Sequence, residues 1–401
     1  MTRRAPRALI IGGSLGGLFT ANLLHRSGWD VQVYEQSPVP LAGRGAGIIP
    51  HPGLFAALER IGIAIDESFG VDIPLRAAFD RSGAVVGTLA VPQKLTTWGR
   101  LHELLMSAFP ASRYHYGCAL DRIDARADAV TATFTDGNTA RGQLLVGADG
   151  IRSCVRAQLL PEAKPRYVGY VGWRGLADEN ALSPKVHDAL FPLFTFCLPE
   201  REQMLGYPVA GHSGSTRPGE RCYNFVWYRP ADEATTLREL CTDAAGLCHG
   251  SSIPPPLIRE AVRERILRAA DDKLSPQFIE VVRRARQPFF QPIHDVESSH
   301  MAFGRVALVG DAAFVARPHC GMGVTKGAGD AMALAGWLQA ASNDVPSALR
   351  AYDGQRVRFG AAVVAHGREL GAYLEGSTSE EAASHHTPEA VMREIAVDRA
   401  Y

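Results

Sequence analysis

Six residues near the N-terminus, GGSLGG at 12–17, have the spacing of a turn that binds a pyrophosphate. In the pattern GxGxxG the first glycine makes a tight turn, the second lets the backbone approach the phosphates, and the third lets helix and strand pack closely. Gly12 and Gly17 fill the first and third positions, and Ser14, followed by Leu15, fills the second. Serine is small, and its hydroxyl can face a phosphate. A helix starting here would add free N–H groups and partial positive charge for the anion.

A carboxylate follows the turn at the distance expected of a ribose-binding group. Glu35 comes 23 residues after Gly12, at the end of a run that alternates as a strand does, and Gln36 follows it. A carboxylate at this place accepts hydrogen bonds from ribose hydroxyls and disfavours a 2′-phosphate. The turn and Glu35 therefore predict bound FAD or NAD rather than NADP. The alternative is a plain glycine-rich loop beside a surface glutamate.

The elements around the turn predict an α/β fold. An apolar run, the glycine turn, a helical pattern and the alternating run form one βαβ unit, which implies parallel strands. Two later runs, at 143–150 and 304–311, have the same strand-and-turn style, and a helical pattern follows the second at 326–341. Short strand-like runs with Pro/Gly turns, typical of an antiparallel sheet, lie between them at 168–176, 193–199, 203–209 and 222–228. Amphipathic helical patterns follow at 257–270 and 276–286. We therefore expect a Rossmann-like nucleotide-binding domain interrupted by a substrate domain with a mostly antiparallel sheet.

The amino-acid composition excludes several classes of protein. Of 401 residues, 46% are apolar and 21% are charged, which excludes a disordered chain. The 42 basic and 42 acidic residues balance, so no bulk charge favours nucleic acid or an anionic membrane. No apolar run is long enough to span a bilayer. Seven scattered cysteines without a CxxC pair argue against a disulfide scaffold or a zinc cluster and indicate a reducing compartment, so we expect a cytoplasmic protein without a metal site.

Two further motifs carry a family resemblance: GADGIRSCVR at 147–156 and GDAAFVARPHCGMGVTKGAGD at 310–330. With the glycine turn and Glu35, they resemble the single-component FAD-dependent aromatic hydroxylases, the family of p-hydroxybenzoate hydroxylase. The resemblance extends to about residue 375. Within it, VGYVGWRG at 168–175, NFVWY at 224–228 and RPH at 317–319 look most like the branch that contains 2,6-dihydroxypyridine hydroxylase.

The resemblance implies a division of the chain and a set of FAD contacts. The FAD-binding domain would comprise residues 1–71, 99–166 and 293–375, the substrate domain 72–98 and 167–292, and the C-terminal tail 376–401. Asp311 would hydrogen-bond the ribityl chain, Asp149 would touch FAD and NAD(P)H, and Arg100 would reach the ribityl and phosphate region. Arg44 would lie beside the isoalloxazine. Phe314 and Thr325 stand where the family usually has histidine and asparagine.

The physics of residues 310–323 agrees with bound flavin. A strand ends at Asp311, and Pro318 fixes the local backbone. The GMG motif, Gly321, Met322 and Gly323, then opens a helix whose free N–H groups can face the pyrimidine edge of a flavin and stabilise negative charge there. The alternative is an ordinary capped helix after a strand.

No hydrolytic triad or metal site occurs in the sequence, so the difficult chemistry belongs to the cofactor. The resemblance implies that NAD(P)H reduces the flavin, dioxygen forms a flavin hydroperoxide, and an electron-rich aromatic or N-heteroaromatic ring, such as a hydroxypyridine, is hydroxylated. The residues expected on the substrate side are His51, Arg174, Tyr207, Tyr228 and His319. Each of these has a structural core position as its alternative. Trp173 and Trp227 are expected in the core, with an aromatic wall of the pocket as the alternative.

Other functions stay open at this point. One alternative is a flavin-dependent reductase or dehydrogenase without oxygen insertion, and another is a non-catalytic flavin-binding protein. A flavin-dependent halogenase is disfavoured because the WxWxIP segment of those enzymes is absent. A homodimer is left open.

Overall fold

The N-terminal βαβ unit forms the middle of a six-stranded sheet. In the computed structural model, which describes residues 5–41, 47–250 and 252–399, β1 (Arg7–Ile11) pairs in parallel with β2 (Asp30–Tyr34), and α1 (Leu15–Arg26) connects them. Four of the five β1 residues are buried and apolar, as expected of a central parallel strand. The strand order is β16 (Ala302–Phe303), β17 (Val306–Leu308), β10 (Leu144–Gly147), β1, β2 and β6 (Tyr114–His115). The β16–β17 pair is antiparallel and the others are parallel.

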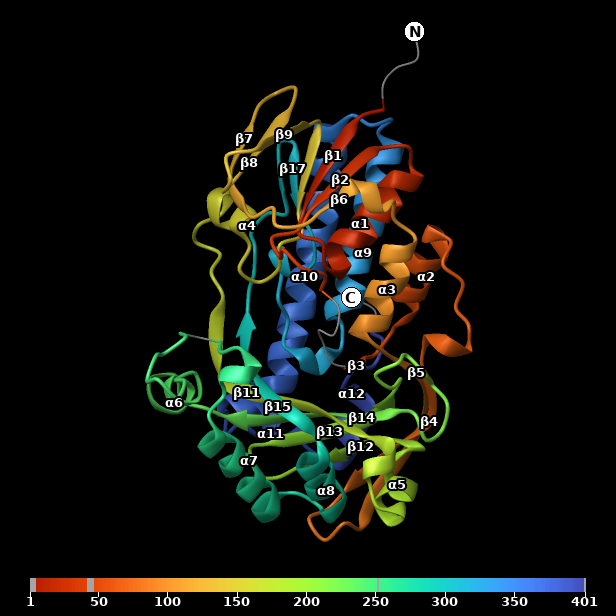
Figure 1. The fold of residues 1–401 in the computed structure, drawn as a ribbon, viewed down its shortest axis with the longest axis vertical. Helices are drawn as coiled ribbons and strands as arrows, with labels where there is room; N and C mark the ends of the chain where they lie inside the picture. The colour runs from red at the N-terminus through yellow and green to blue at the C-terminus, as the bar shows by residue number, and fades with distance from the viewer. Residues whose placement is uncertain (1–4, 42–46, 251, 400–401) are drawn as a thin grey trace.

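Helices and a small sheet cover this first sheet (Figure 1). The helices packed around it are α1, α2 (Pro52–Ile61), α3 (Trp98–Ser107), α9 (Gly323–Ala340) and α10 (Val345–Glu375). The small antiparallel sheet contains β7 (Leu120–Ala125), β8 (Val130–Phe134) and β9 (Thr139–Gly142), and α4 (Cys154–Leu159) packs against β7.

The second large sheet has eight strands and is mostly antiparallel. Their order is β15 (Arg286–Asp295), β11 (Arg166–Asp178), β14 (Cys222–Pro230), β13 (Gln203–Val209), β12 (Leu193–Cys197), β4 (Val71–Phe79), β5 (Val85–Thr97) and β3 (Gly47–Ile48). The helices α5 (Pro184–Leu190), α6 (Arg238–Leu240), α7 (Glu260–Lys273) and α8 (Pro276–Arg284) accompany it. Only β12 and β4 pair in parallel among the described strands of this sheet. The expected fold class, a Rossmann-like domain plus a mostly antiparallel sheet, is confirmed.

One helix connects the two large sheets. The 31-residue α10 runs from the six-stranded sheet to the eight-stranded one (Figure 1). Near its start, the Tyr352 hydroxyl donates a 2.7 Å hydrogen bond to the Leu308 carbonyl in β17. At its other end, Glu375 accepts a 2.7 Å bond from Arg317. The chain then returns through α11 (Glu380–Ser384) and α12 (Pro388–Glu394), and α12 packs against β4, β5 and β12.

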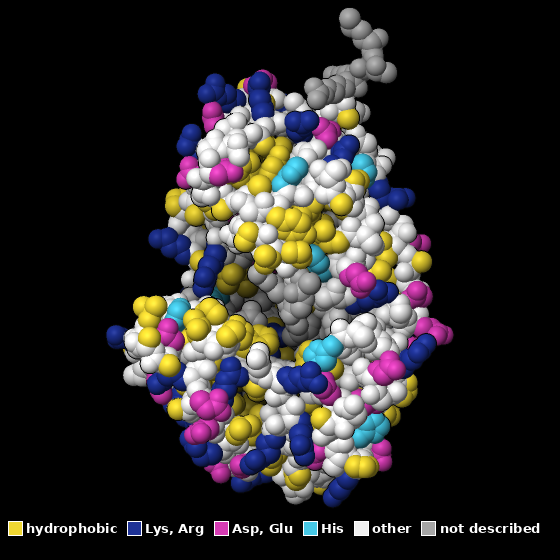
Figure 2. All heavy atoms as spheres, viewed as in Figure 1, with side chains coloured by type: hydrophobic (Ala, Val, Ile, Leu, Met, Phe, Trp, Pro, Cys, Tyr) yellow, Lys and Arg dark blue, Asp and Glu magenta, His cyan; other side chains and the backbone are white. Residues whose placement is uncertain are grey.

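The apolar cores follow the sheets. One core belongs to the six-stranded sheet, a second lies between the eight-stranded sheet and α7 and α8, and a third lies on its other face, against α10 and α12. The third core joins residues of both predicted domains, such as Val363 and Tyr228, and the predicted domain boundaries stay a prediction. Figure 2 shows a hollow between the upper and lower halves of the molecule. No helix in the described ranges has both the length and the apolar content that crossing a bilayer requires.

Candidate active site

The glycine turn lies where β1 meets α1. Gly12 has a left-handed φ of +103°, and a Cβ there would be 2.4 Å from the carbonyl oxygen of Ala148. A Cβ on Gly17 would be 1.9 Å from the carbonyl oxygen of Gly12. Both positions therefore require glycine. Ser14 is the N-cap residue of α1, and among the described residues its side chain makes no capping hydrogen bond, whereas Leu15 is buried in the core.

Glu35 is hydrogen-bonded to the backbone of this turn. Its buried carboxylate accepts 2.8 Å hydrogen bonds from the backbone N–H groups of Gly13 and Ser37. The Tyr114 hydroxyl donates a 3.0 Å bond to the carbonyl of Gly13. Each carboxylate oxygen keeps a second lone pair for a ligand hydroxyl. The predicted ribose-binding residue thus also fixes the shape of the turn, which the sequence did not indicate.

A cavity of about 520 Å³, here called the glycine-turn cavity, opens beside the turn. Five of the predicted cofactor residues line it: Gly12, Ser14, Glu35, Gln36 and Asp149. The structure therefore brings together side chains that are far apart in the sequence, at the carboxyl ends of parallel strands, where α/β sheets bind ligands.

Two predicted cofactor residues, Asp149 and Arg100, form hydrogen bonds with other residues of the chain. The Asp149 carboxylate accepts hydrogen bonds from the Ser153 hydroxyl at 2.5 Å and from the Cys154 N–H at 2.7 Å, and so caps α4. Burial raises the pKa of Asp149. Arg100 lies on α3 and does not line the glycine-turn cavity. Its two terminal nitrogens donate to Ser68 at 2.7 Å and to Glu103 at 3.0 Å. The Arg100 Nε is buried and has no partner among the described residues. Arg44 falls in residues 42–46, outside the described residues.

A second cavity of about 240 Å³, here called the central cavity, lies between the eight-stranded sheet and the segment that leads into α9. The predicted residues on its walls are Arg174, Tyr207, Tyr228, Asp311, Pro318, Gly321 and Gly323. Its volume is near the lower limit of the about 300–1,000 Å³ typical of small-molecule sites.

The sheet wall of the central cavity carries a cation and two phenols. Arg174 pairs with Val226 across β11 and β14, and Tyr228 lies two residues further along β14, on the same face. Burial raises the pKa of Tyr228 to about 12, and it raises that of Tyr207 further, so both phenols stay protonated at neutral pH. The Arg174 Nε is buried without a hydrogen-bond partner in the described part of the chain. This wall offers donors and a positive charge to a ring oxygen.

The two tryptophans face the other side of this sheet. Trp173 pairs with Trp227 across β11 and β14, and both are buried in the core shared with α7 and α8. Because neighbouring residues of a strand point to opposite faces, Trp173 cannot share the cavity face of Arg174. The expected core position of both tryptophans is confirmed.

The opposite wall is the turn that starts α9. Residues 318–320 form a short 3₁₀ turn, Gly321 has a left-handed φ of +66°, and α9 begins at Gly323. Met322 is buried beside the turn. The first N–H groups of a helix have no partners within it and carry partial positive charge, so this wall can hold an electron-rich ring edge.

Asp311 has a cationic neighbour that the sequence analysis missed. The Asp311 side chain is 52% exposed and lines the central cavity, and the Lys326 Nζ lies 3.8 Å from its Oδ1. Lys326 is 1% exposed, and among the described residues its Nζ has no hydrogen-bond partner. Burying an ammonium group without hydrogen bonds is costly, so this site is built for an acceptor from outside the chain.

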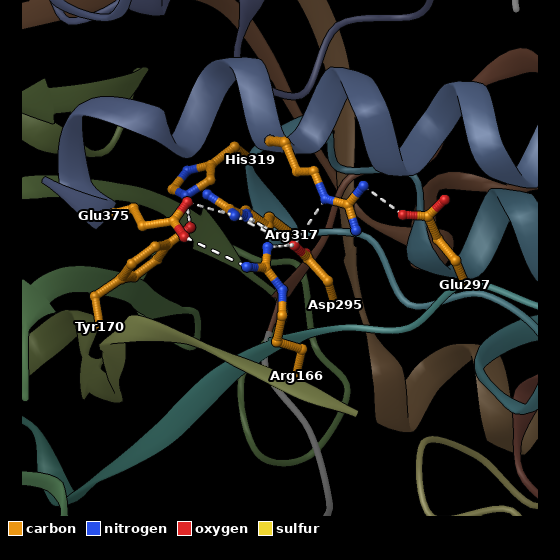
Figure 3. Close-up of polar contacts among 8 residues, drawn as sticks. Arg166, Tyr170, Asp295, Glu297, Arg317, His319 and Glu375 are labelled. Carbon is orange, nitrogen blue, oxygen red and sulfur yellow. Dashed lines mark hydrogen bonds and ion pairs between the residues drawn. The ribbon is translucent and has the colours of Figure 1, made fainter. Parts of the chain in front are cut away.

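A buried ion-pair network fixes the segment before α9 (Figure 3). Arg317 and Asp295 are each 1% exposed, and the Arg317 Nη2 lies 3.2 Å from Asp295 Oδ2 and 2.7 Å from Glu375 Oε2. Arg368 and Arg166 also approach Asp295, at 3.1 Å and 3.4 Å. The network therefore joins β15, α10 and the cavity wall at one point.

The two predicted histidines lie behind the cavity walls. His319 is fully buried, bonds the Tyr170 hydroxyl through Nε2 at 2.9 Å, and packs 4.4 Å from the Tyr228 ring, centroid to centroid. His51 is buried at the N-cap of α2, beside Gly321. Burial lowers the pKa of His51 and, together with the Arg317 cation, lowers that of His319 to about 3.

Because His319 stays neutral in the folded protein, the free energy of unfolding depends on pH. In the unfolded chain its imidazole takes up a proton near pH 6.5, whereas the folded protein keeps it neutral down to about pH 3. The unfolded state therefore binds more protons in this window, and stability is lost as the pH falls through it, by up to about 1.4 kcal/mol per pH unit. We expect His319→Gln to flatten the pH dependence of urea unfolding between about pH 4.5 and 6.5. The exposed His300→Gln is the control, and equal slopes for the two variants would contradict the assignment.

The two cavities together fit a flavin dinucleotide. Gly12 and Gly17 leave a cradle that a Cβ would fill, Glu35 keeps acceptor capacity for a ribose, and Asp311 offers a carboxylate to the ribityl hydroxyls. The buried Lys326 Nζ, 3.8 Å from Asp311 Oδ1, adds a positive charge behind this carboxylate, whereas Arg100 lines neither cavity.

Several wall residues carried no signal in the sequence. The central cavity is also lined by residues 291–294 of β15 and by Ile395 and Ala396 from the C-terminal tail, whose role the sequence did not indicate. In the sequence Lys326 looks like an ordinary helical lysine. Its position three residues after Gly323 of the GMG motif was the one signal that could have identified it.

Comparisons with known proteins agree with this geometry. Residues 167–295, from β11 to β15, match the family described as FAD binding domain-like. The chain is 30% identical over 386 residues to 2,6-dihydroxypyridine 3-monooxygenase of Paenarthrobacter nicotinovorans, which covers 95% of this chain and 94% of that protein. The structure of 2,6-dihydroxypyridine-3-hydroxylase from Arthrobacter nicotinovorans superposes with a TM-score of 0.86 at 29% identity, covering 94% and 95% of the two chains. A Klebsiella pneumoniae HpxO variant in complex with FAD has a TM-score of 0.79 at 25% identity, covering 97% and 95%.

Proposed function

The chain belongs to the family of FAD-dependent aromatic monooxygenases, and from this premise we propose that it hydroxylates a small, electron-rich ring of the hydroxypyridine type. NAD(P)H and dioxygen are the co-substrates. Bound FAD, reduced by NAD(P)H, supplies the chemistry that activates dioxygen. The chain's own residues bind and orient the ring, control its protonation and exclude water.

The observation that supports this proposal is that two chemically different walls face each other across the small central cavity. Arg174, Tyr207 and Tyr228 offer a cation and two hydroxyl donors on one side, and Asp311 and the Gly321 turn lie on the other. A guanidinium close to a ring hydroxyl favours the deprotonated form, which makes the ring richer in electrons. A hydroxypyridine has ring oxygens for these donors.

Most of the remaining lining of the central cavity is apolar. Leu205, Val226, Ile293, Val315 and Val324 surround the polar groups with apolar surface. A dry site strengthens the interaction of Arg174 with a ring anion and protects reactive intermediates from water.

One assay tests the proposal against its rivals. The purified protein, loaded with FAD, is mixed with NADH or NADPH and, in turn, with 2,6-dihydroxypyridine, a phenol and a hydroxypurine. We expect the hydroxypyridine to stimulate NAD(P)H oxidation and to yield a product heavier by one oxygen atom, detected by mass spectrometry. NAD(P)H consumption without an oxygenated product would indicate a reductase, and no consumption with any ring would indicate a non-catalytic flavoprotein.

Arg174 should set the pH at which the ring binds as an anion. A nearby cation lowers the pKa of an acidic group by about 1–3 units, so Arg174→Met should move the acidic limb of kcat, which reports the enzyme–substrate complex, upward by about that amount. Arg174→Lys should restore part of the shift. The control is Arg286→Met on β15, whose exposed side chain pairs with Asp178. An unshifted pH profile in Arg174→Met would contradict the role.

Cytoplasmic localisation and the assignment of single residues to FAD stay predictions, and a homodimer stays open.

A further inference from the structure

We propose that the C-terminal segment 388–396 is a wall of the central cavity and that Ile395 sets the size of the ring admitted. The inference rests on the proposed function. Ile395 and Ala396 line the central cavity together with Arg174, Tyr207 and Tyr228, and both are 1% exposed. The last described part of the chain therefore lies in the candidate substrate site.

The path of the chain brings this segment to the site. After α10 ends at Glu375, the chain continues through α11 and α12 (Figure 1), α12 packs against β4, β5 and β12, and Ile395 and Ala396 then reach the central cavity. Val391 and Met392 of α12 are buried in the core that β4 and β5 share with the cavity walls. The segment thus packs as part of the fold.

Arg76 binds the segment 388–396 from the side of the eight-stranded sheet, and its hydrogen bonds to this segment are here called the clamp. Arg76 lies on β4, is fully buried, and donates from Nη1 to the carbonyls of Met392 at 3.0 Å and Ile395 at 2.7 Å. Its Nη2 donates to the Ala396 carbonyl at 3.2 Å, and the Gln93 side-chain amide donates to the same oxygen at 3.2 Å.

The buried cation of the clamp has uncharged oxygens as its partners, three from backbone carbonyls and one from the Gln93 side chain. No carboxylate pairs with Arg76 within residues 5–41, 47–250 and 252–399, whereas most other buried arginines have one. Three of its acceptors are carbonyls at or just beyond the carboxyl end of α12, where the helix dipole is negative. The fourth is the Gln93 Oε1 of β5, which accepts from Nε at 3.0 Å and from Nη2 at 2.6 Å. A buried guanidinium needs such acceptors, so the position of the segment and the burial of Arg76 depend on each other.

The other side of the segment is held by the turn that starts α9. The Ala396 N–H donates a 2.8 Å bond to the His319 carbonyl. Ala396 has a left-handed φ of 51°, and its Cβ is 2.8 Å from where a Cβ on Gly321 would lie. The segment is therefore fixed to both walls of the central cavity, and Ile395 lies between these two attachments.

The consequence for specificity follows from packing. A branched aliphatic side chain held on both sides cannot move aside for a larger ring. Shortening Ile395 should open space next to the substrate, and enlarging it should remove space that a single ring needs. One methylene in an apolar pocket changes discrimination by about 10–200-fold.

The test uses the full-length, FAD-loaded protein and two ring probes, monocyclic 2,6-dihydroxypyridine and bicyclic 2,6-dihydroxyquinoline. Dissociation constants are measured from the change in flavin absorbance, and hydroxylated product is measured separately. We expect Ile395→Ala to shift the ratio of the two dissociation constants at least about tenfold toward the bicyclic ring. We expect Ile395→Phe to weaken binding of the monocyclic ring by at least about tenfold. The matched control is Arg393→Ala, an exposed α12 residue that pairs with Glu389, and it should stay within about twofold of wild type.

A second measurement tests the clamp without any turnover. Arg76→Met should release the segment, so that trypsin cleaves after Arg393 at least about tenfold faster than in wild type. Unchanged binding ratios in both Ile395 variants would overturn the inference. Failure of the proposed function is a separate result: wild type would then bind rings without forming an oxygenated product, and the binding ratios would still decide whether Ile395 is a wall.

Discussion

Gly17→Ala is expected to weaken FAD binding by about a hundredfold, corresponding to about 3 kcal/mol of overpacking. The added Cβ would be 1.9 Å from the carbonyl oxygen of Gly12, a backbone atom that cannot move without deforming the turn. The deformation would also disturb the Gly13 N–H that donates to Glu35. The measurement is the FAD content of the purified protein and its dissociation constant from flavin fluorescence.

The neighbouring glycine provides a matched control. A Cβ on Gly16 meets no described atom within 4 Å, and alanine is favoured over glycine inside a helix. Gly16→Ala should therefore bind FAD within about twofold of wild type. Circular dichroism shows whether each variant keeps its secondary structure. Equal FAD affinity in the two variants would mean that the turn does not hold the cofactor.

Asp295→Ala should cost about 3–5 kcal/mol of the free energy of unfolding. The substitution leaves the Arg317 guanidinium, 1% exposed, with Glu375 as its remaining ion-pair partner among the described residues. It also removes the charge that attracts Arg368 and Arg166. The measurement is the urea midpoint at constant m-value, which reports a change in stability.

Two variants make this prediction specific. Asp128→Ala removes an exposed pair with Arg141 and should cost no more than about 1 kcal/mol. The double variant Asp295→Leu/Arg317→Met removes both buried charges and should recover most of the lost stability. A double variant no more stable than Asp295→Ala would show that packing, and not an unpaired charge, causes the loss.

Local patterns were sufficient to predict several elements. The short strand-like run at 203–209 predicts a strand, and β13 has the same bounds. The helical pattern at 276–286 is confirmed as α8, which ends two residues earlier, at Arg284, because β15 begins at Arg286. Pro276 at the first turn of α8 marks its start, since proline fits there without losing a helical hydrogen bond. These features depend on residues close together in the chain.

Distant contacts account for what the sequence did not reveal. Arg76 and Ala396 are 320 positions apart, and neither has a neighbouring motif that indicates their hydrogen bond. The burial of Lys326 likewise depends on tertiary packing around α9. Trp173 was left open as a wall of the same pocket as Arg174, and the pairing of β11 with β14 places it on the opposite face, in the core.

The continuity of α10 limits how a ring can enter the central cavity. An unbroken helix of 31 residues is about 46 Å long. Tyr352 ties it to β17 of the six-stranded sheet near its start, and at its end Glu375 pairs with Arg317, which in turn pairs with Asp295 of β15 in the eight-stranded sheet. A hinge rotation that swung the two sheets apart would have to bend this helix or break one of these ties. Substrate exchange is therefore a matter of local rearrangement at the cavity rim, while the two halves of the molecule keep a fixed mutual orientation.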